Sequence, residues 1–482
     1  MTIVLHNTLT RKAEPLQPLR EGHIGMYVCG PTVYDDCHIG HLMGPAIFDA
    51  VARWFTARGL RVRFVNNITD IDDKIINRSR ETGEPWQAIT ERIIAQYNGW
   101  LKMLHVATIT DQPRCTQYVA QMVRYVEELV AKGRAYVAAD GVYYEVTRQE
   151  NYGKLSGRRL DEMEAGARIE RDAHLHHPAD FALWKLAKPG EPSWPSPWGD
   201  GRPGWHIECS VMSSELLGGA FDIHGGGDDL KFPHHENEIA QAEAHGDAYA
   251  SCWMHNGLVQ YEGVKVGKSD PRMKDAAFRR QFMADHLIGT YGAPTIRFLL
   301  LSGHYRRPID FGPAAIAAAK TALTRLLKQL GQRCEAPAAV ADAAALARLL
   351  EPTLPPQADK ARAAFCTALD DDINTGAAIA QLFTLASEAN KAPEAQRGAI
   401  LDVCCGLGRV IGLFQPGDLA ALSAGSAAGA GDERLGQVMA LVLELRQKAR
   451  ANRDFATSDL IRDRLKAAGI TVKDGKDGAT WE

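Results

Sequence analysis

Two histidines flank Gly40 in the run His38-Ile39-Gly40-His41. The run follows an apolar strand pattern and a Gly-Pro-Thr turn, and it precedes the apolar pattern of a helix. A helix N-terminus offers free N–H groups and the positive end of the helix dipole, so histidines there can hold phosphate oxygens. Gly40 lets a nucleotide lie close to the backbone. The pattern suggests ATP binding, although two histidines that only cap a helix would look the same.

Lys265 and Lys268 stand three residues apart in the run KVGKS, after the predicted strand 253–259. Two lysines on one loop can stabilise charge that develops on a triphosphate. A solvated basic loop is the alternative.

Asp229 follows the glycine triplet 225–227, which permits close backbone approach, and its carboxylate could accept a hydrogen bond from a ribose hydroxyl. Here the alternative is an ordinary tight turn.

Four residues form a candidate metal site. His234 and Glu238 are four apart on a predicted helix, so their side chains share one face. Cys29 ends the first predicted strand and Cys209 lies in the run WHIECS, both near positions where open α/β sheets bind ligands. Two thiolates, one imidazole and one carboxylate could hold a single ion. Isolated cysteines are more often small buried hydrophobes, so spacing leaves both interpretations open.

The hydrophobic pattern predicts an α/β unit that an insertion divides. Strands are expected at residues 24–29, 61–65 and 221–225, with helices between them. Residues 115–204 change to one helix, short strands and a Pro/Trp-rich passage. From residue 294 onward apolar residues recur at helical spacing. Two tracts rich in Ala, Pro, Gly and Ser, 335–357 and 415–431, predict a loop-rich joint and a flexible linker.

Composition limits the possible classes of protein. The chain has 482 residues, enough for about three domains, and 45% hydrophobic and 24% charged residues are typical of a folded protein. A net charge of −4 argues against a protein that coats nucleic acid. We find no membrane-spanning run and no secretory signal, and the nine cysteines are odd in number and scattered. A reducing, cytoplasmic location is expected.

Taken in order, these segments resemble the cysteinyl-tRNA synthetases, a family of class I aminoacyl-tRNA synthetases, over nearly the full chain. The motifs that carry the resemblance are MYVCGPTVYDDCHIGH (26–41), NNITDIDDKI (66–75), GEPSWPSPWG (190–199), GRPGWHIECS (201–210), DIHGGGDDLKFPHHENEIAQ (222–241), the lysine loop, RFLLLSGHYR (297–306) and ALDDDINT (368–375). The implied activity is ATP-dependent activation of L-cysteine to cysteinyl-adenylate, then transfer of cysteine to the terminal adenosine of tRNA(Cys).

The resemblance assigns a role to each candidate residue. His38, His41, Lys265 and Lys268 are the implied catalytic residues, and together with Gly40 and Asp229 they are the implied ATP contacts, with Mg²⁺ accompanying ATP. Cys29, Cys209, His234 and Glu238 are the implied ligands of one Zn²⁺. Gly30, Thr32, Thr69 and Trp205 are the implied contacts of the amino acid.

Zinc suits the discrimination that such an enzyme needs. Serine is nearly isosteric with cysteine, so a pocket that reads shape separates the two poorly. Zinc prefers a thiolate to a hydroxyl and lowers the pKa of a bound thiol. Direct coordination of the substrate sulfur would select cysteine at the binding step and make editing unnecessary.

The implied fold is a Rossmann-like class I catalytic domain with a connective insertion, followed by an all-α anticodon-binding bundle and a small C-terminal module. The expected bounds are 1–115 and 205–290 for the two catalytic halves, 116–204 for the insertion, 291–415 for the stem-contact and helical region, 416–431 for a linker and 432–482 for the C-terminal module. Two basic runs, Lys320 to Arg333 and Arg446 to Arg453, could meet tRNA phosphates, or could be solvated helix faces. A monomer is expected.

Two departures from the family pattern concern ATP. The lysine loop reads KVGKS where the family has KMSKS, and Asp-Pro-Arg follows it; both lysines are kept, so we expect reduced loop closure or a higher ATP requirement. Leu42-Met43 stands where many members carry a small residue and an arginine.

Two other functions are alternatives to tRNA charging. One is a ligase that joins cysteine to an amino sugar, which would not need residues 310–482, and the other is a tRNA-binding paralogue with impaired catalysis.

Overall fold

The computed structural model describes residues 2–160, 175–266, 270–335, 354–452, 454–467, 472–475 and 478–481. Its strands are β1 Val4–Asn7, β2 Lys12–Pro15, β3 His23–Val28, β4 Arg61–Asn66, β5 Ala135–Ala138, β6 Gly141–Tyr144, β7 Phe181–Leu186, β8 Gly201–Pro203, β9 Ala220–Gly227, β10 Tyr249–Asn256, β11 Val259–Tyr261, β12 Val264–Lys265, β13 Ile309–Asp310, β14 Val472–Gly475 and β15 Gly478–Trp481. Its α-helices are α1 Ile39–Ala57, α2 Asp73–Thr82, α3 Trp86–Met103, α4 Val119–Ala131, α6 Trp205–Leu217, α7 Glu236–His245, α8 Ala276–Arg280, α9 Ala284–Tyr291, α10 Ala293–Leu301, α11 Pro313–Leu330, α13 Pro356–Asp370, α14 Thr375–Lys391, α15 Glu394–Val410, α16 Asp418–Ala451 and α17 Phe455–Ala467.

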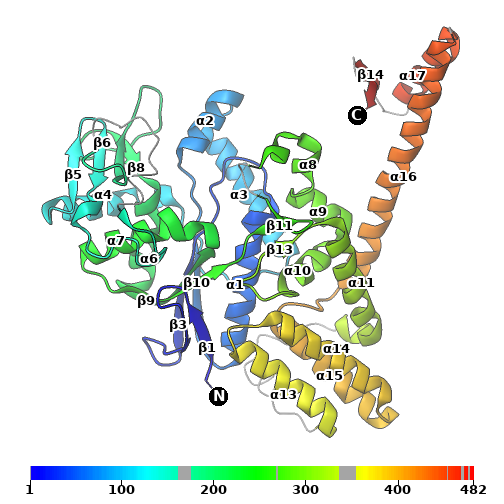
Figure 1. Cartoon of the computed structure of the whole chain (residues 1–482), viewed down its shortest axis with the longest axis horizontal. Helices are drawn as coiled ribbons and strands as arrows, with labels where there is room; N and C mark the ends of the chain where they lie inside the picture. Colours follow the sequence, from blue (N-terminus) through cyan, green and yellow to red (C-terminus); the bar gives the residue numbers. More distant parts are fainter. Residues whose placement is uncertain are drawn as a thin grey trace.

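A parallel sheet with the strand order β10-β9-β3-β4 forms the centre of the molecule (Figure 1). Adjacent residues of a strand point to opposite faces of the sheet. On β9, Gly225 faces α1, because a Cβ built there would overlap the ring of Phe48. The neighbouring His224 therefore faces the other side, where it contacts Glu238 of α7. Strands covered on both faces are buried and apolar, as expected for a parallel sheet.

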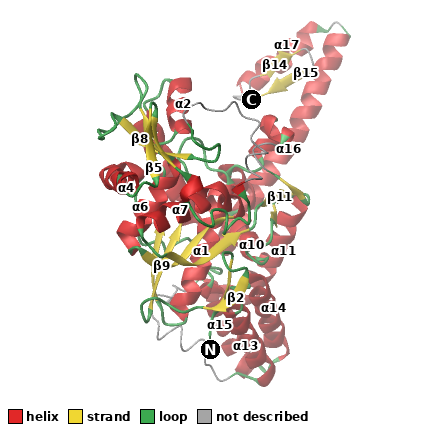
Figure 2. Cartoon of the chain, turned by 60° about the vertical axis from the view of Figure 1, so that its left-hand side comes forward, coloured by secondary structure: helices red, strands yellow, loops and turns green. Residues whose placement is uncertain are grey.

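The connective insertion is a separate antiparallel sheet. Its strands lie in the order β5-β6-β7-β8, and α4 packs against it and against α6 and α7 (Figure 2). The sequence places all of these strands between the two halves of the parallel sheet. The expectation of a divided α/β unit followed by a helical region is therefore confirmed.

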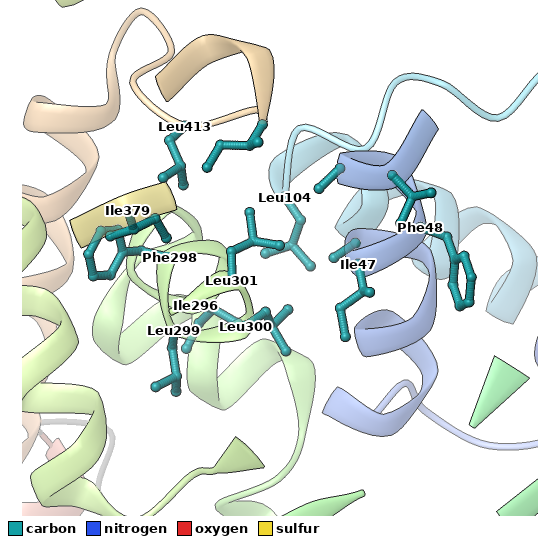
Figure 3. Close-up of a cluster of buried hydrophobic side chains, with 14 of the residues drawn as sticks. Ile47, Phe48, Leu104, Ile296, Phe298, Leu299, Leu300, Leu301, Ile379 and Leu413 are labelled. Atoms are coloured by element: carbon teal, nitrogen blue, oxygen red, sulfur yellow. The ribbon is translucent and has the colours of Figure 1, made fainter. Parts of the chain in front are cut away.

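The helical region packs directly on the catalytic half. In Figure 3, Ile296, Phe298 and Leu301 of α10 lie between Ile47 of α1 and Ile379 of α14. Each fully buried aliphatic or aromatic side chain contributes about 1.5–3 kcal/mol relative to exposure. The catalytic sheet and the bundle thus share one continuous hydrophobic core.

One element differs from the sequence-based expectation. Residues 416–431 were expected to be a flexible linker, but from Asp418 they lie inside α16, which runs to Ala451 and packs on α9, α10 and α11 (Figure 1). The physical reason is that alanine has the highest helix propensity, and the many alanines here offset the glycines. For the joint expected at 335–357, residues 336–353 lie outside the described part of the chain.

Candidate functional site

Four side chains from four segments meet below the carboxyl ends of β3 and β9. Cys29 follows β3, Cys209 lies in the second turn of α6, His234 precedes α7, and Glu238 lies in its first turn. Cys29 Sγ is 3.7 Å from Cys209 Sγ and 3.7 Å from Glu238 Oε1, and His234 Nε2 is 3.2 Å from the same Oε1. The donor atoms of all four residues lie within 4.8 Å of one another. The structure thus brings together the four residues that the sequence singled out as metal ligands.

The electrostatics of this cluster favour the ionised forms of two of its four donors. Burial raises the pKa of Cys209, but the hydrogen bond from Cys29 and the nearby His234 lower it to about 6. Burial and the neighbouring Cys209 hold the pKa of Cys29 well above its ordinary value. Burial also opposes ionisation of Glu238, yet the charges of His224 and His234 hold the pKa of Glu238 below its usual range. Cys209 and Glu238 are thus the two donors whose pKa values are lowered, which favours the ionised forms that bind metals.

Two histidines that the sequence analysis missed surround these ligands. His224 Nε2 lies 2.8 Å from Glu238 Oε2, and His235 Nε2 lies 3.4 Å from Cys29 Sγ. Together with Cys29 and Glu238 they form a second group whose donor atoms also lie within 4.8 Å of one another. A signal was present in the runs DIHGGG and PHHEN, but spacing alone did not distinguish His235 from His234. Partners that orient metal ligands in this way are a general feature of metal sites.

Trp205 covers the outer side of the cluster. Its ring stacks on that of His234 at a centroid distance of 4.3 Å, and His206 Nδ1 lies 2.9 Å from His234 Nδ1. Trp205 is 38% exposed, although its neighbours His206 and His234 are buried. An exposed aromatic ring beside a buried polar cluster offers an apolar wall to a small ligand.

The other proposed amino-acid contacts line the adjacent loops. Thr32 and Thr69 pair as neighbouring extended segments, and the Gly30 amide donates to Asn67 Oδ1 over 2.9 Å. A Cβ built on Gly30 would overlap the carbonyl oxygen of Asn67, so only glycine permits this approach. The Thr69 hydroxyl donates to Glu208, which the sequence analysis did not single out; burial raises the pKa of Glu208 well above its usual range.

His38 and His41 lie at the N-terminus of α1, as expected. The rings stack at a centroid distance of 3.8 Å, His38 Nδ1 accepts the Gly40 amide over 3.1 Å, and the His38 amide donates to His41 Nδ1 over 3.3 Å. The strand-like bridge between His38 and Met283 joins this turn to the chain that follows the lysine loop. Both histidines are partly exposed, so their outer edges can reach a ligand.

The structure describes two of the three remaining candidates for ATP binding. Asp229 is exposed directly beyond β9, and a Cβ on Gly227 would approach its carboxylate to 2.5 Å. Lys265 is exposed at the end of β12, in the small sheet β12-β11-β13. Lys268 lies outside the described residues.

Several side chains of the two basic runs already contact other residues of the chain. The Arg325 guanidinium lies 4.8 Å from the Phe383 ring centroid, and Arg333 pairs with Asp402 at 2.7 Å. In α16, Arg446 is buried, while Lys448 is exposed and pairs with Glu444 at 2.6 Å. These side chains are therefore less available to bind tRNA phosphates than the sequence suggests.

The fold is shared with solved class I synthetases. The structure of Mycobacterium tuberculosis methionyl-tRNA synthetase in complex with methionyl-adenylate superimposes with a TM-score of 0.55 at 15% identity, covering 83% of this chain and 92% of that one. Residues 15–321 match the family model of the class I (C) tRNA synthetase catalytic domain. Fold and site together define a class I aminoacyl-tRNA synthetase.

Closer relatives identify the family. The cysteine–tRNA ligases of Alkalilimnicola ehrlichii and Laribacter hongkongensis are 46% and 45% identical to this chain, each aligned over 99% of both sequences. Residues 364–415 match the DALR domain, and residues 437–481 match the cysteinyl-tRNA ligase anticodon binding domain. The chain belongs to the cysteine–tRNA ligase family, as the resemblance of its motifs predicted.

Proposed function

We propose that this chain activates L-cysteine with ATP to cysteinyl-adenylate, releases pyrophosphate, and transfers cysteine to the 2′-hydroxyl of the terminal adenosine of tRNA(Cys). The observation that carries this proposal is the convergence of two thiols, an imidazole and a carboxylate within 4.8 Å in a class I synthetase catalytic domain. Such a donor set can hold a thiophilic metal ion, and that ion would distinguish the thiol of cysteine from the hydroxyl of serine.

The donor set fits Zn²⁺. Zinc is bound by thiolate sulfur, imidazole nitrogen and carboxylate oxygen, and its catalytic sites keep one position for substrate. Cys29, Cys209, His234 and Glu238 would hold one ion. When bound, zinc supplies a soft Lewis acid that prefers the thiolate of cysteine to the hydroxyl of serine. Trp205, Gly30, Thr32 and Thr69 would enclose the rest of the amino acid.

The activation step relies on positioning and charge. His38 and His41 would donate to phosphate oxygens from the N-terminus of α1, where the helix dipole adds positive potential. Gly40 and Asp229 would contact the nucleoside, and Lys265 and Lys268 would stabilise charge on the leaving pyrophosphate, with Mg²⁺ accompanying ATP. No covalent intermediate with the protein is needed, because the cysteine carboxylate is itself the nucleophile.

The second step requires tRNA, which we assign to the helical region and the C-terminal module. We propose domain bounds of 1–115 and 205–290 for the catalytic halves, 116–204 for the insertion, 291–415 for the bundle and 432–482 for the module. A cytoplasmic monomer is the proposed form. Among the described helices, none is both long and apolar enough to span a membrane.

The alternative of a cysteine–amino-sugar ligase is less well supported, since such an acceptor needs neither a DALR domain nor the matched anticodon binding domain at 437–481. The alternative of an impaired tRNA-binding paralogue is opposed by the assembled donor cluster, because a binding protein has no need of it.

Charging of an unfractionated tRNA pool tests the proposal. We expect the purified protein to attach labelled cysteine, and not serine, to tRNA. The variant Cys209→Ala should lose cysteine charging by at least about 100-fold, because removing a ligand removes sulfur recognition. Cys404→Ala is the matched control, since Cys404 is a buried thiol in the bundle.

Each failure of this experiment has a distinct meaning. Cysteine-dependent pyrophosphate exchange without tRNA charging would replace the tRNA acceptor by a small molecule. Equal charging with serine would refute the sulfur-recognition proposal. Loss of both reactions in a zinc-loaded protein would indicate that the KVGKS loop has removed the activation chemistry.

A further inference from the structure

The two carboxylate oxygens of Glu238 face different groups. Oε1 lies toward the donor cluster, 3.2 Å from His234 Nε2 and 3.7 Å from Cys29 Sγ. Oε2 points away from the cluster and accepts the Tyr249 hydroxyl over 2.7 Å, with His224 Nε2 at 2.8 Å. Glu238 is fully buried, so the hydrogen bonds to Oε2 are not shared with water.

Tyr249, which donates to Glu238 Oε2, is held in place by its surroundings. It is the first residue of β10 and only 3% exposed, and its ring packs nearly perpendicular to that of Phe221 at a centroid distance of 5.0 Å. Ser213 Oγ donates to its hydroxyl over 3.1 Å, which leaves the hydroxyl proton for Glu238. A tyrosine hydroxyl beside a carboxylate can only donate, and His224 Nε2 donates to the same oxygen, so Oε2 accepts two hydrogen bonds.

The backbone of Tyr249 adds a second observation. Its φ is +60°, in the left-handed region that bulky side chains rarely adopt. Its amide donates to the Gly219 carbonyl over 2.9 Å, so this conformation is built into the start of the strand. Strained residues persist where the surrounding contacts over-determine them, and they cluster at functional sites.

We propose that Tyr249 is a positioning residue that determines specificity: by occupying Oε2 of Glu238, it makes the carboxylate present one oxygen to the bound metal and keeps a coordination position open for the substrate thiol. A carboxylate that bound through both oxygens would take that position. This inference rests on the proposed zinc site and deepens it. Hydrogen-bond partners of metal ligands commonly change metal affinity or activity by about 10–100-fold.

The test uses Tyr249→Phe, which removes only the hydroxyl, in the full-length protein loaded with Co²⁺. The absorption of Co²⁺ weakens as its coordination number rises. We expect the wild type to show intense four-coordinate bands that weaken when cysteine is added. Tyr249→Phe should show weaker bands before cysteine is added, a cysteine KM about tenfold higher with kcat within twofold, and a smaller preference for cysteine over serine.

Tyr125→Phe is the matched control. Tyr125 is a second buried tyrosine, and its hydroxyl has no hydrogen-bond partner within the described part of the chain. Its removal should leave the Co²⁺ spectrum and the cysteine KM unchanged. Melting temperatures with and without metal separate positioning from packing: loss of positioning lowers only the temperature of the metal-loaded protein.

Three results would overturn the proposal. One is a Tyr249→Phe protein with the wild-type Co²⁺ spectrum and cysteine KM. Another is an equal fall in the melting temperature with and without metal, which would indicate a packing role only. The third needs no variant: a wild-type Co²⁺ spectrum that is already five-coordinate before cysteine is added. If the wild type lacks cysteine-dependent pyrophosphate exchange, the proposed function fails, but the Co²⁺ spectra still report how Glu238 binds.

Discussion

At the scale of single residues, the site depends on close approach as much as on charge. The Gly30 amide donates to Asn67, which fixes the loop directly after Cys29. A Cβ at position 30 would overlap the backbone carbonyl oxygen of Asn67. Rotation of a side chain could not relieve this overlap, because the overlapping atom belongs to the backbone. Cys29, the first of the proposed metal ligands, is therefore positioned by a neighbouring residue without a side chain.

Substituting Gly30→Ala should therefore lower the free energy of unfolding by about 1–3 kcal/mol, the cost of overpacking, and raise the cysteine KM. Denaturant unfolding and pyrophosphate exchange are the measurements. Gly99→Ala is the control, since Gly99 lies inside α3 with open space around it and alanine there should stabilise the helix by about 0.5–1 kcal/mol. Equal effects of the two substitutions would refute the argument.

At the scale of secondary-structure elements, α16 is the connection between the bundle and the C-terminal module. It extends over 34 residues and ends beside α17 (Figure 1). A helix transmits a fixed direction and length, about 1.5 Å for each residue, whereas a flexible linker does not. The position of the module relative to the catalytic site thus depends on the continuity of this helix.

A proline in α16 tests this continuity. Ala428→Pro should cost about 3 kcal/mol of helix stability, reduce helicity in circular dichroism, and impair tRNA charging while cysteine-dependent pyrophosphate exchange stays unchanged. Ala428→Gln, which keeps a good helix former at the same position, serves as the control. Unchanged helicity and charging in the proline variant would mean that 416–431 acts as the flexible linker that its composition predicted.

At the scale of the whole molecule, one buried ion pair joins the catalytic half to the bundle. Asp49 of α1 accepts Arg297 of α10 at 2.6 Å, and Arg297 also donates to the carbonyl oxygens of Leu104 and Ile411. Both charged side chains are almost fully buried. Removing one partner from such a pair leaves an uncompensated buried charge and costs about 3–5 kcal/mol.

Asp49→Asn should accordingly destabilise the protein by about 3 kcal/mol or more at pH 7. Burial raises the pKa of Asp49, but Arg297 and Arg53 outweigh it and hold this pKa below its ordinary value. The stabilisation is then present above the unfolded pKa of about 3.9 and is lost as the pH falls through the lower folded value. Urea unfolding of both proteins should give a difference that shrinks below pH 4; a constant difference would contradict the assignment.

The sequence by itself determined the chemistry and the order of the elements. The types and spacing of His38, His41 and the four donor residues made them candidates, and the resemblance of their motifs to one family assigned their roles; hydrophobic periodicity was sufficient to predict the divided α/β unit. The periodicity and each motif are local features, whereas the approach of Cys29 to Cys209 and Glu238 joins segments that are distant in the sequence. The helix at 418–431 was missed because turn-forming residues and alanine favour opposite structures there.

Only the tertiary structure decided which groups surround the donors. His224, Tyr249 and Glu238 come from β9, β10 and α7, and their contacts exist only because α7 packs on the face of the sheet where these two parallel strands lie side by side. Single-sequence patterns carry no information on such contacts, since a buried tyrosine that orients a ligand has the same pattern as one that fills a core. The partners of the donor residues are therefore determined by packing, which the pattern of a single segment does not report.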